Sequence, residues 1–147
     1  ILSSCTDSSN PTETAIDNTQ DVAIVDAPLT EVVWQLQQYK NTNGEIISIV
    51  PSNEYSIGFR DVYSDQLLIG FIGCHSLLAR YSLLGDLITV SVETITNNNC
   101  NEENVELTEF ELFYLTTLTS IASHQIEGNE LTIQSSESSI LKFKLVE

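Results

Sequence analysis

Apolar and polar positions alternate along most of the chain from residue 29 onward, and this period of two is typical of strands with one buried face. Trp34 and Leu36, for example, alternate with two glutamines. The Asn-Gly pair at 43–44 predicts a type I′ hairpin turn, and the polar run 60–65 predicts a loop. Strands are expected at 34–37, 45–50, 55–59, 66–74, 77–83, 87–92, 131–134 and 141–145.

The period changes after the polar break at 97–101. Glu102 and Glu103 follow the break, and acidic side chains suit the first turn of a helix, where the helix dipole is positive. The spacing predicts one helix over 102–119. Seven or eight short strands and one late helix predict a mainly β (α+β) fold, an antiparallel barrel, closed or nearly so, with the helix covering one opening. The apolar stripe of this helix consists of Leu107, Phe110, Tyr114, Leu118 and Ile121.

The first residues of the chain resemble a targeting signal. Leu-Ser-Ser-Cys at positions 2–5 resembles the lipobox of bacterial lipoproteins, in which the cysteine receives a lipid. This resemblance implies a signal-peptide remnant at 1–4, a lipid anchor on Cys5 and a membrane as a partner of the chain. Residues 5–28 are rich in Ser, Thr, Asn and Asp, which predicts a disordered tether, with a short strand over 22–25. The alternative is an ordinary tail with a free thiol, and the folded domain is expected at 29–147.

The chain is strongly acidic. It carries 21 Asp and Glu against 5 Lys and Arg, a formal net charge of −16. Such a surface repels phosphate backbones, so nucleic acid is not expected as a partner. One interpretation is that the charge keeps the protein soluble, and the alternative is that it attracts a cationic partner.

Two cysteines remain once Cys5 is assigned to the anchor. Cys74 and Cys100 are expected either to form a disulfide, as cysteines of exported domains do, or to stay buried free thiols. A zinc site that adds His75 and His124 lacks the paired short spacings of structural zinc motifs, so no metal or cofactor is expected. The sequence has no Gly-x-Ser-x-Gly, phosphate-loop or His-Glu-x-x-His motif. No catalytic residue is therefore assigned.

One apolar pair is not explained by the expected core. If the strand over 77–83 buries Leu77 and its alternate neighbours, Leu78 and Leu84 lie on the opposite face together with Arg80. A contact patch for a protein partner or a lipid is one interpretation. Burial of this face under the tether or the helix is the other.

Six residues along the chain have the order and spacing of a known family: Trp34, Gly70, Gly73, Cys74, His75 and Tyr81. Over 29–147 the chain resembles META domains, the heat-shock protein HslJ-like family, which is often found in bacterial envelope lipoproteins. The resemblance implies a small β-barrel-like fold with one helix, a link to stress tolerance and no catalytic mechanism. The family usually has Asn after the central Gly-Cys, where this chain has His.

These observations together predict a lipid-anchored protein of the bacterial cell envelope, on the periplasmic or surface face of the outer membrane. It is expected to act as a non-enzymatic binding or structural module, with an unknown protein partner. One alternative is a calycin-like binder of small apolar ligands, which needs a vacant barrel interior. Another is an acidic inhibitor of a cationic cell-wall hydrolase.

Overall fold

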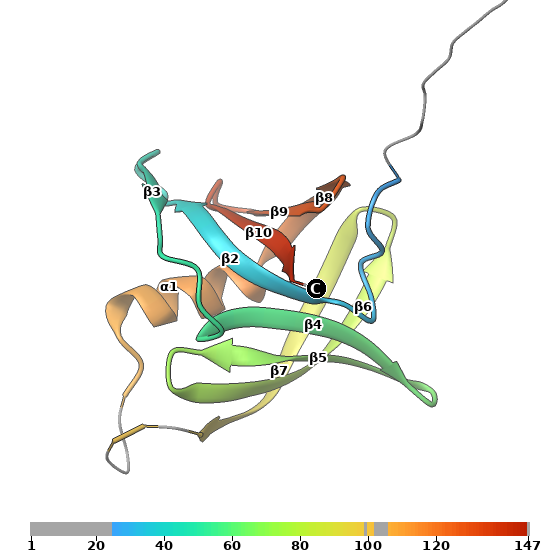
Figure 1. The fold of residues 1–147 in the computed structure, drawn as a ribbon, viewed down its shortest axis with the longest axis horizontal. Helices are drawn as coiled ribbons and strands as arrows, with labels where there is room; N and C mark the ends of the chain where they lie inside the picture. Colours follow the sequence, from blue (N-terminus) through green and yellow to red (C-terminus); the bar gives the residue numbers. More distant parts are fainter. Residues whose placement is uncertain (1–24, 99, 102–105, 147) are drawn as a thin grey trace, which may run out of the picture.

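The computed structural model describes residues 25–98, 100–101 and 106–146. This part of the chain holds nine strands and one helix (Figure 1). The elements are β2 (Val33–Lys40), β3 (Ile46–Ser48), β4 (Tyr55–Val62), β5 (Asp65–Ile72), β6 (His75–Leu84), β7 (Leu87–Asn97), α1 (Glu109–Leu118), β8 (Ile121–Glu127), β9 (Glu130–Ser135) and β10 (Ile140–Val146). Cys5 and residues 6–24 of the expected tether, which include 22–24 of the expected short strand, lie outside the described residues. Residues 25–28 are described, and Val25 is not in a strand. The prediction of a disordered tether is wrong for Asp26 and Ala27, because the Asp26 carboxylate accepts from the amide of Gly128 and the amide of Ala27 donates to the Gly128 carbonyl, each at 2.8 Å.

All nine strands belong to one antiparallel sheet. Its order is β7-β6-β5-β4-β2-β10-β9-β8, and β3 pairs with β2 beside this path. The sheet curls into a half-barrel, so the β6–β7 hairpin rises toward β8 (Figure 1). The two edge strands approach each other where the amide of His124 donates to the carbonyl of Asp86 at 2.9 Å. The mainly β, barrel-like fold expected from the pattern is confirmed.

The concave face of the sheet and α1 enclose a core packed with side chains. Trp34, Phe59, Tyr114 and Phe143 have at most 1% of their surface exposed. Alternate residues of β6 point inward, as the period of two predicts. Because large aromatic and aliphatic side chains occupy the space between β2, β4, β10 and α1, the interior offers little support for the calycin-like alternative.

The polar run 60–65 is not a loop. β4 and β5 stay paired up to Val62 and Asp65, and only Tyr63 and Ser64 lie in the turn. Tyr63 is fully exposed. Because the tip of this hairpin projects into water, both of its faces accept polar residues, and the sequence loses the alternation that would have marked a strand.

The hairpin turn at 43–44 also differs from the expected type I′. The amide of Gly44 donates to the carbonyl of Asn41 at 3.0 Å, and the amide of Asn41 donates to the carbonyl of Glu45 at 3.0 Å. Among the turn residues only Gly44 has a positive φ, +88°. This is the pattern of a type I turn followed by a glycine bulge. The strand after it is shorter than expected and ends at Ser48.

The helix begins later than the acidic residues at 102–103 suggested. Residues 106–108 are not helical, and 102–105 lie outside the described residues. Thr108 caps α1: its hydroxyl accepts from the amide of Glu111, whose carboxylate accepts from the amide of Thr108, a capping box. Ile121, expected on the helix stripe, begins β8, and β7 runs five residues beyond the predicted end at 92.

Candidate functional site

Residues 70–75, at the centre of the motif, form the end of β5, the turn that follows it and the first residue of β6. β5 ends at Ile72, Gly73 and Cys74 make a two-residue turn, and His75 begins β6. Gly73 has φ +62°, and a Cβ there would collide with the carboxylate of Glu111. A Cβ on Gly70 would collide with the backbone carbonyl of Ser56 on β4. Both glycines are therefore needed for close approach of other groups.

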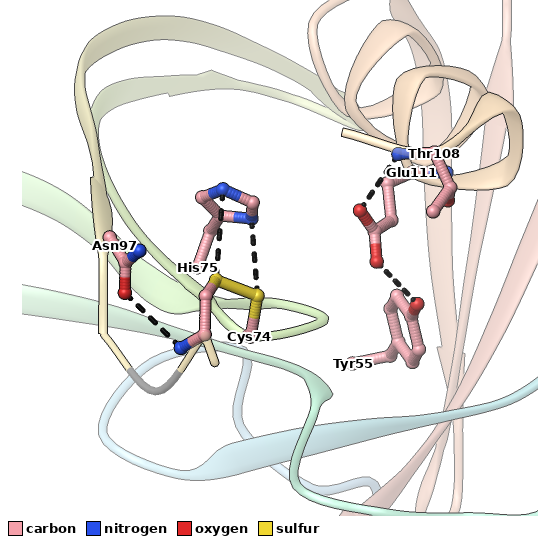
Figure 2. Close-up of a disulfide and its surroundings, with 7 residues drawn as sticks. Tyr55, Cys74, His75, Asn97, Thr108 and Glu111 are labelled. Atoms are coloured by element: carbon pink, nitrogen blue, oxygen red, sulfur yellow. Dashed lines mark hydrogen bonds between the residues drawn. A yellow bond between two sulfur atoms is a disulfide. The ribbon is translucent and has the colours of Figure 1, made fainter. Parts of the chain in front are cut away.

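A disulfide closes this corner of the fold. It joins Cys74 in the turn to Cys100, which follows β7, with the two Cα atoms 4.9 Å apart. Figure 2 shows the ring of His75 beside the two sulfur atoms. Nδ1 lies 3.9 Å from Sγ of Cys74, and Nε2 lies 3.9 Å from Sγ of Cys100. Asn97 Oδ1 accepts from the amide of Cys100 at 3.1 Å.

A buried carboxylate connects the same corner to the helix. Glu111 is 7% exposed, accepts from the hydroxyl of Tyr55 at 2.9 Å and accepts from the amide of Thr108 at 3.0 Å (Figure 2). Burial and the bond to Glu111 raise the pKa of Tyr55 above its usual value. The carboxylate thus fixes the first turn of α1 against β4 and the Gly73 turn.

The other two motif residues hold the core together. Trp34 is fully buried, and its Nε1 donates to the carbonyl of Leu29 at 3.1 Å. Tyr81 packs edge-on against Phe59, with ring centroids 5.0 Å apart, and its hydroxyl donates to Asp61 at 3.0 Å. Burial, and then the bond to Asp61, raises the pKa of Tyr81 to about 12. These contacts give Trp34 and Tyr81 structural roles.

The structure does not gather Leu78, Arg80 and Leu84 into a compact patch. Leu78 is half-buried, whereas Leu84 is 78% exposed. The two leucines lie six residues apart on β6, roughly 20 Å along an extended strand. Arg80 between them pairs with Asp65 at 3.1 Å and Glu93 at 3.4 Å, and these carboxylates raise the pKa of its guanidinium.

His124 does not join the cysteines. It lies on β8, and its Nδ1 is 2.8 Å from the carbonyl of Asp86 in the β6–β7 turn. Cys74 and His75 lie at the opposite end of that long hairpin. The four-ligand zinc site therefore does not assemble, although the ligand atoms of Cys74, His75 and Cys100 lie within 4.8 Å of one another.

A surface hollow that the sequence did not predict lies beside Tyr55, the hydrogen-bond partner of Glu111. We call it the aromatic hollow. It has a volume of about 390 Å³, within the range of roughly 300–1,000 Å³ that ligand sites occupy. Phe110 of α1 stands between Tyr39 and Tyr55, with ring centroids 4.8 Å and 5.1 Å away. The lining residues are Tyr39, Ile49, Val50, Ser52, Glu54, Tyr55 and Phe110.

A second, larger depression of about 690 Å³ is lined mostly by aliphatic residues, among them Val25, Ala27 and Leu145. It is bordered by Val25 and Asp26, the first residues that the structure describes. The aromatic hollow, built from β2, β4, α1 and the connection before β4, is thus the better-defined ligand site of the two.

Comparison with known proteins gives a family for this fold. The family model described as META domain matches residues 27–147. No curated protein is significantly similar in sequence to the chain. Within the described residues, no helix is both long and apolar enough to span a bilayer.

Two solved structures share the fold. An NMR structure of a protein from Burkholderia xenovorans has a TM-score of 0.59 at 18% identity, and the match covers 88% of this chain and 97% of that one. A second NMR structure has a TM-score of 0.52 at 16% identity, and the match covers 80% and 91% of the two chains. At these identities the likeness is one of fold.

Proposed function

The chain belongs to the META domain family, and from that premise we propose that it is a non-enzymatic binding module of the bacterial cell envelope. The domain is held at a membrane by a lipid on Cys5, serves in stress tolerance as the family resemblance implies, and binds its ligand in the aromatic hollow. The hollow is the observation that carries the binding role.

The lining of the hollow indicates the class of ligand. Three aromatic rings offer apolar surface and π faces, which attract cations as well as apolar groups. Glu54, an exposed carboxylate, lies at the same hollow. The chain as a whole carries a formal charge of −16, which draws cations and repels anions. The ligand we propose is a small organic cation with an apolar or aromatic body.

Two features support a binding module over an enzyme. Because the core is packed, space for a ligand lies at the surface, and the aromatic hollow offers such a space. The buried carboxylate nearest to it, Glu111, already accepts hydrogen bonds from Tyr55 and Thr108, and His75 lies against the disulfide.

The disulfide supports the envelope location. Disulfides persist in oxidising compartments such as the periplasm and are rare in the cytosol. Cys74 and Cys100 enclose a separation of 26 residues, and in the chain-entropy model such a bridge stabilises by roughly 3–4 kcal/mol.

Titration with benzyltrimethylammonium, followed by amide chemical shifts in NMR spectra, tests the binding role. We expect shifts concentrated at Tyr39, Val50, Tyr55 and Phe110, and weaker binding of benzyl alcohol, which lacks the charge. Glu54→Gln should weaken binding of the cation more than binding of the alcohol.

A matched pair of variants separates the hollow from general charge effects. Val50 is 86% exposed and lines the hollow, whereas Ile46 is 63% exposed and does not. Val50→Arg should abolish binding, because it places a cation and a long side chain at the hollow. Ile46→Arg makes the same charge change and should leave binding intact. Shifts spread over other surfaces, or equal binding by both variants, would refute the proposal.

A further inference from the structure

We propose that Cys74, His75 and Cys100 form a three-ligand zinc site when the disulfide between the two cysteines is reduced. None of the three ligands lines the aromatic hollow. The site uses two residues fixed by the β5–β6 hairpin and one from the connection after β7.

The spacing of the three ligands favours zinc. Zinc bonds of about 2.0–2.1 Å to nitrogen and about 2.3 Å to sulfur place tetrahedral ligand atoms roughly 3.5–3.8 Å apart. Nδ1 of His75 lies 3.9 Å from Sγ of Cys74, and Nε2 lies 3.9 Å from Sγ of Cys100. One ligand atom from each of the three residues lies within 4.8 Å of the other two. Because zinc takes only one of the two ring nitrogens, that nitrogen has to approach the farther sulfur by at most roughly 1 Å. Only the two sulfurs are closer than a zinc site requires, because they are bonded. Reduction removes that constraint.

The reaction that opens the site is thiol–disulfide exchange. Two molecules of a thiol reductant are oxidised to one disulfide, and their two hydrogens pass to the sulfurs of Cys74 and Cys100. Zn²⁺ then displaces the two thiol protons and is held by two thiolates and a neutral imidazole nitrogen. Metal binding and the disulfide therefore exclude each other.

The surroundings leave room for a fourth ligand. A hollow of about 210 Å³ borders Cys74, with Asn53, Glu54 and Asn98 in its lining. Three protein ligands with one open position is the arrangement in which zinc retains a water molecule. His75 is only 6% exposed, which fixes the imidazole beside the two sulfurs before the metal arrives.

Anaerobic titration of the full chain with Co²⁺, as a spectroscopic probe for the zinc site, tests the proposal. The protein carries Cys5→Ser so that Cys74 and Cys100 are the only thiols. After reduction we expect one Co²⁺ per chain, with a thiolate charge-transfer band that Zn²⁺ removes. The oxidised protein should show neither. His75→Asn, which keeps both thiols, should weaken binding at least tenfold, and His124→Asn should leave it unchanged.

Loss of structure on reduction would still give a decisive result. If the reduced chain unfolds, Zn²⁺ should restore its near-ultraviolet circular dichroism, since the binding free energy of a metal adds to the free energy of folding. Failure of Zn²⁺ to restore the signal, equal Co²⁺ binding by oxidised and reduced protein, or binding unaffected by His75→Asn would each overturn the proposal.

Discussion

Gly73 meets two separate requirements at one position. Its φ of +62° lies in the left-handed region, and the carboxylate of Glu111 occupies the space where a side chain would begin. Gly85, in the next hairpin turn, has nearly the same φ, +63°, but nothing within 4 Å of where its Cβ would lie. A comparison of substitutions at these two glycines therefore separates the free-energy cost of the backbone conformation from the cost of close packing.

Gly73→Ala should therefore destabilise the fold more than Gly85→Ala. The left-handed conformation costs alanine about 1–2 kcal/mol at either position. At position 73 displacement of Glu111 adds an overpacking cost of roughly 1–3 kcal/mol. Urea unfolding measures both free energies, and equal losses in the two variants would show that Glu111 does not pack against the turn.

Tyr81 makes the stability of the fold depend on pH in the alkaline range. Its pKa is about 12 in the folded protein and about 10 in an unfolded chain. Because the raised pKa favours the neutral form in the folded state, the stabilisation is complete below pH 10 and is lost as the pH rises through 12.

Tyr81→Phe should reduce this alkaline loss. Phenylalanine does not ionise, so the free energy of unfolding should fall less steeply between pH 10 and pH 12, although Tyr55 and Tyr114, whose pKa values are also raised, retain part of the slope. At pH 7 the variant loses the bond to Asp61, a cost of about 1 kcal/mol or more. Urea unfolding across this pH range checks both effects, and parallel curves for the two proteins would contradict the assignment.

The elements differ in how well their positions can be predicted from the sequence. β6 was predictable, because one of its faces is buried and its residues alternate. The far ends of β4 and β5 were not, because both faces of that tip meet water. The start of α1 could have been found: Thr108 and Glu111 fit the capping-box pattern, but the acidic residues at 102–103 drew the prediction earlier.

The cap on α1 gives a prediction at this scale. Thr108→Ala removes the hydroxyl that accepts from the amide of Glu111 at 3.1 Å and should cost about 1 kcal/mol. Thr116→Ala, at an exposed position within α1, should be neutral or stabilising by a few tenths of a kcal/mol, because alanine is the better helix former. Urea unfolding compares the two variants, and a cost for Thr116→Ala as large as that for Thr108→Ala would refute the role of the cap.

The assembly of the site depends on the whole fold, which limits what the sequence could reveal. Tyr39, Tyr55 and Phe110 come from three elements, so the aromatic hollow exists only because α1 lies against the start of β4. Likewise, the separation of 26 residues between Cys74 and Cys100 does not show whether the two Cα atoms come within bonding range, so both a bridge and two free thiols were compatible with the sequence. The family motif could be recognised in the sequence, because its residues pack in the core or form turns of the fold.

The central claim, a disulfide-closed domain held in the envelope by a lipid on Cys5, is tested most directly by intact mass. The full chain is expressed behind a lipoprotein signal peptide and recovered from the membrane fraction, with a Cys5→Ser control. The account predicts a lipid-sized mass increase that the control lacks, and a further gain of about 2 Da on reduction, from the two hydrogens that Cys74 and Cys100 take up. An unmodified, soluble product whose mass does not change on reduction would contradict it.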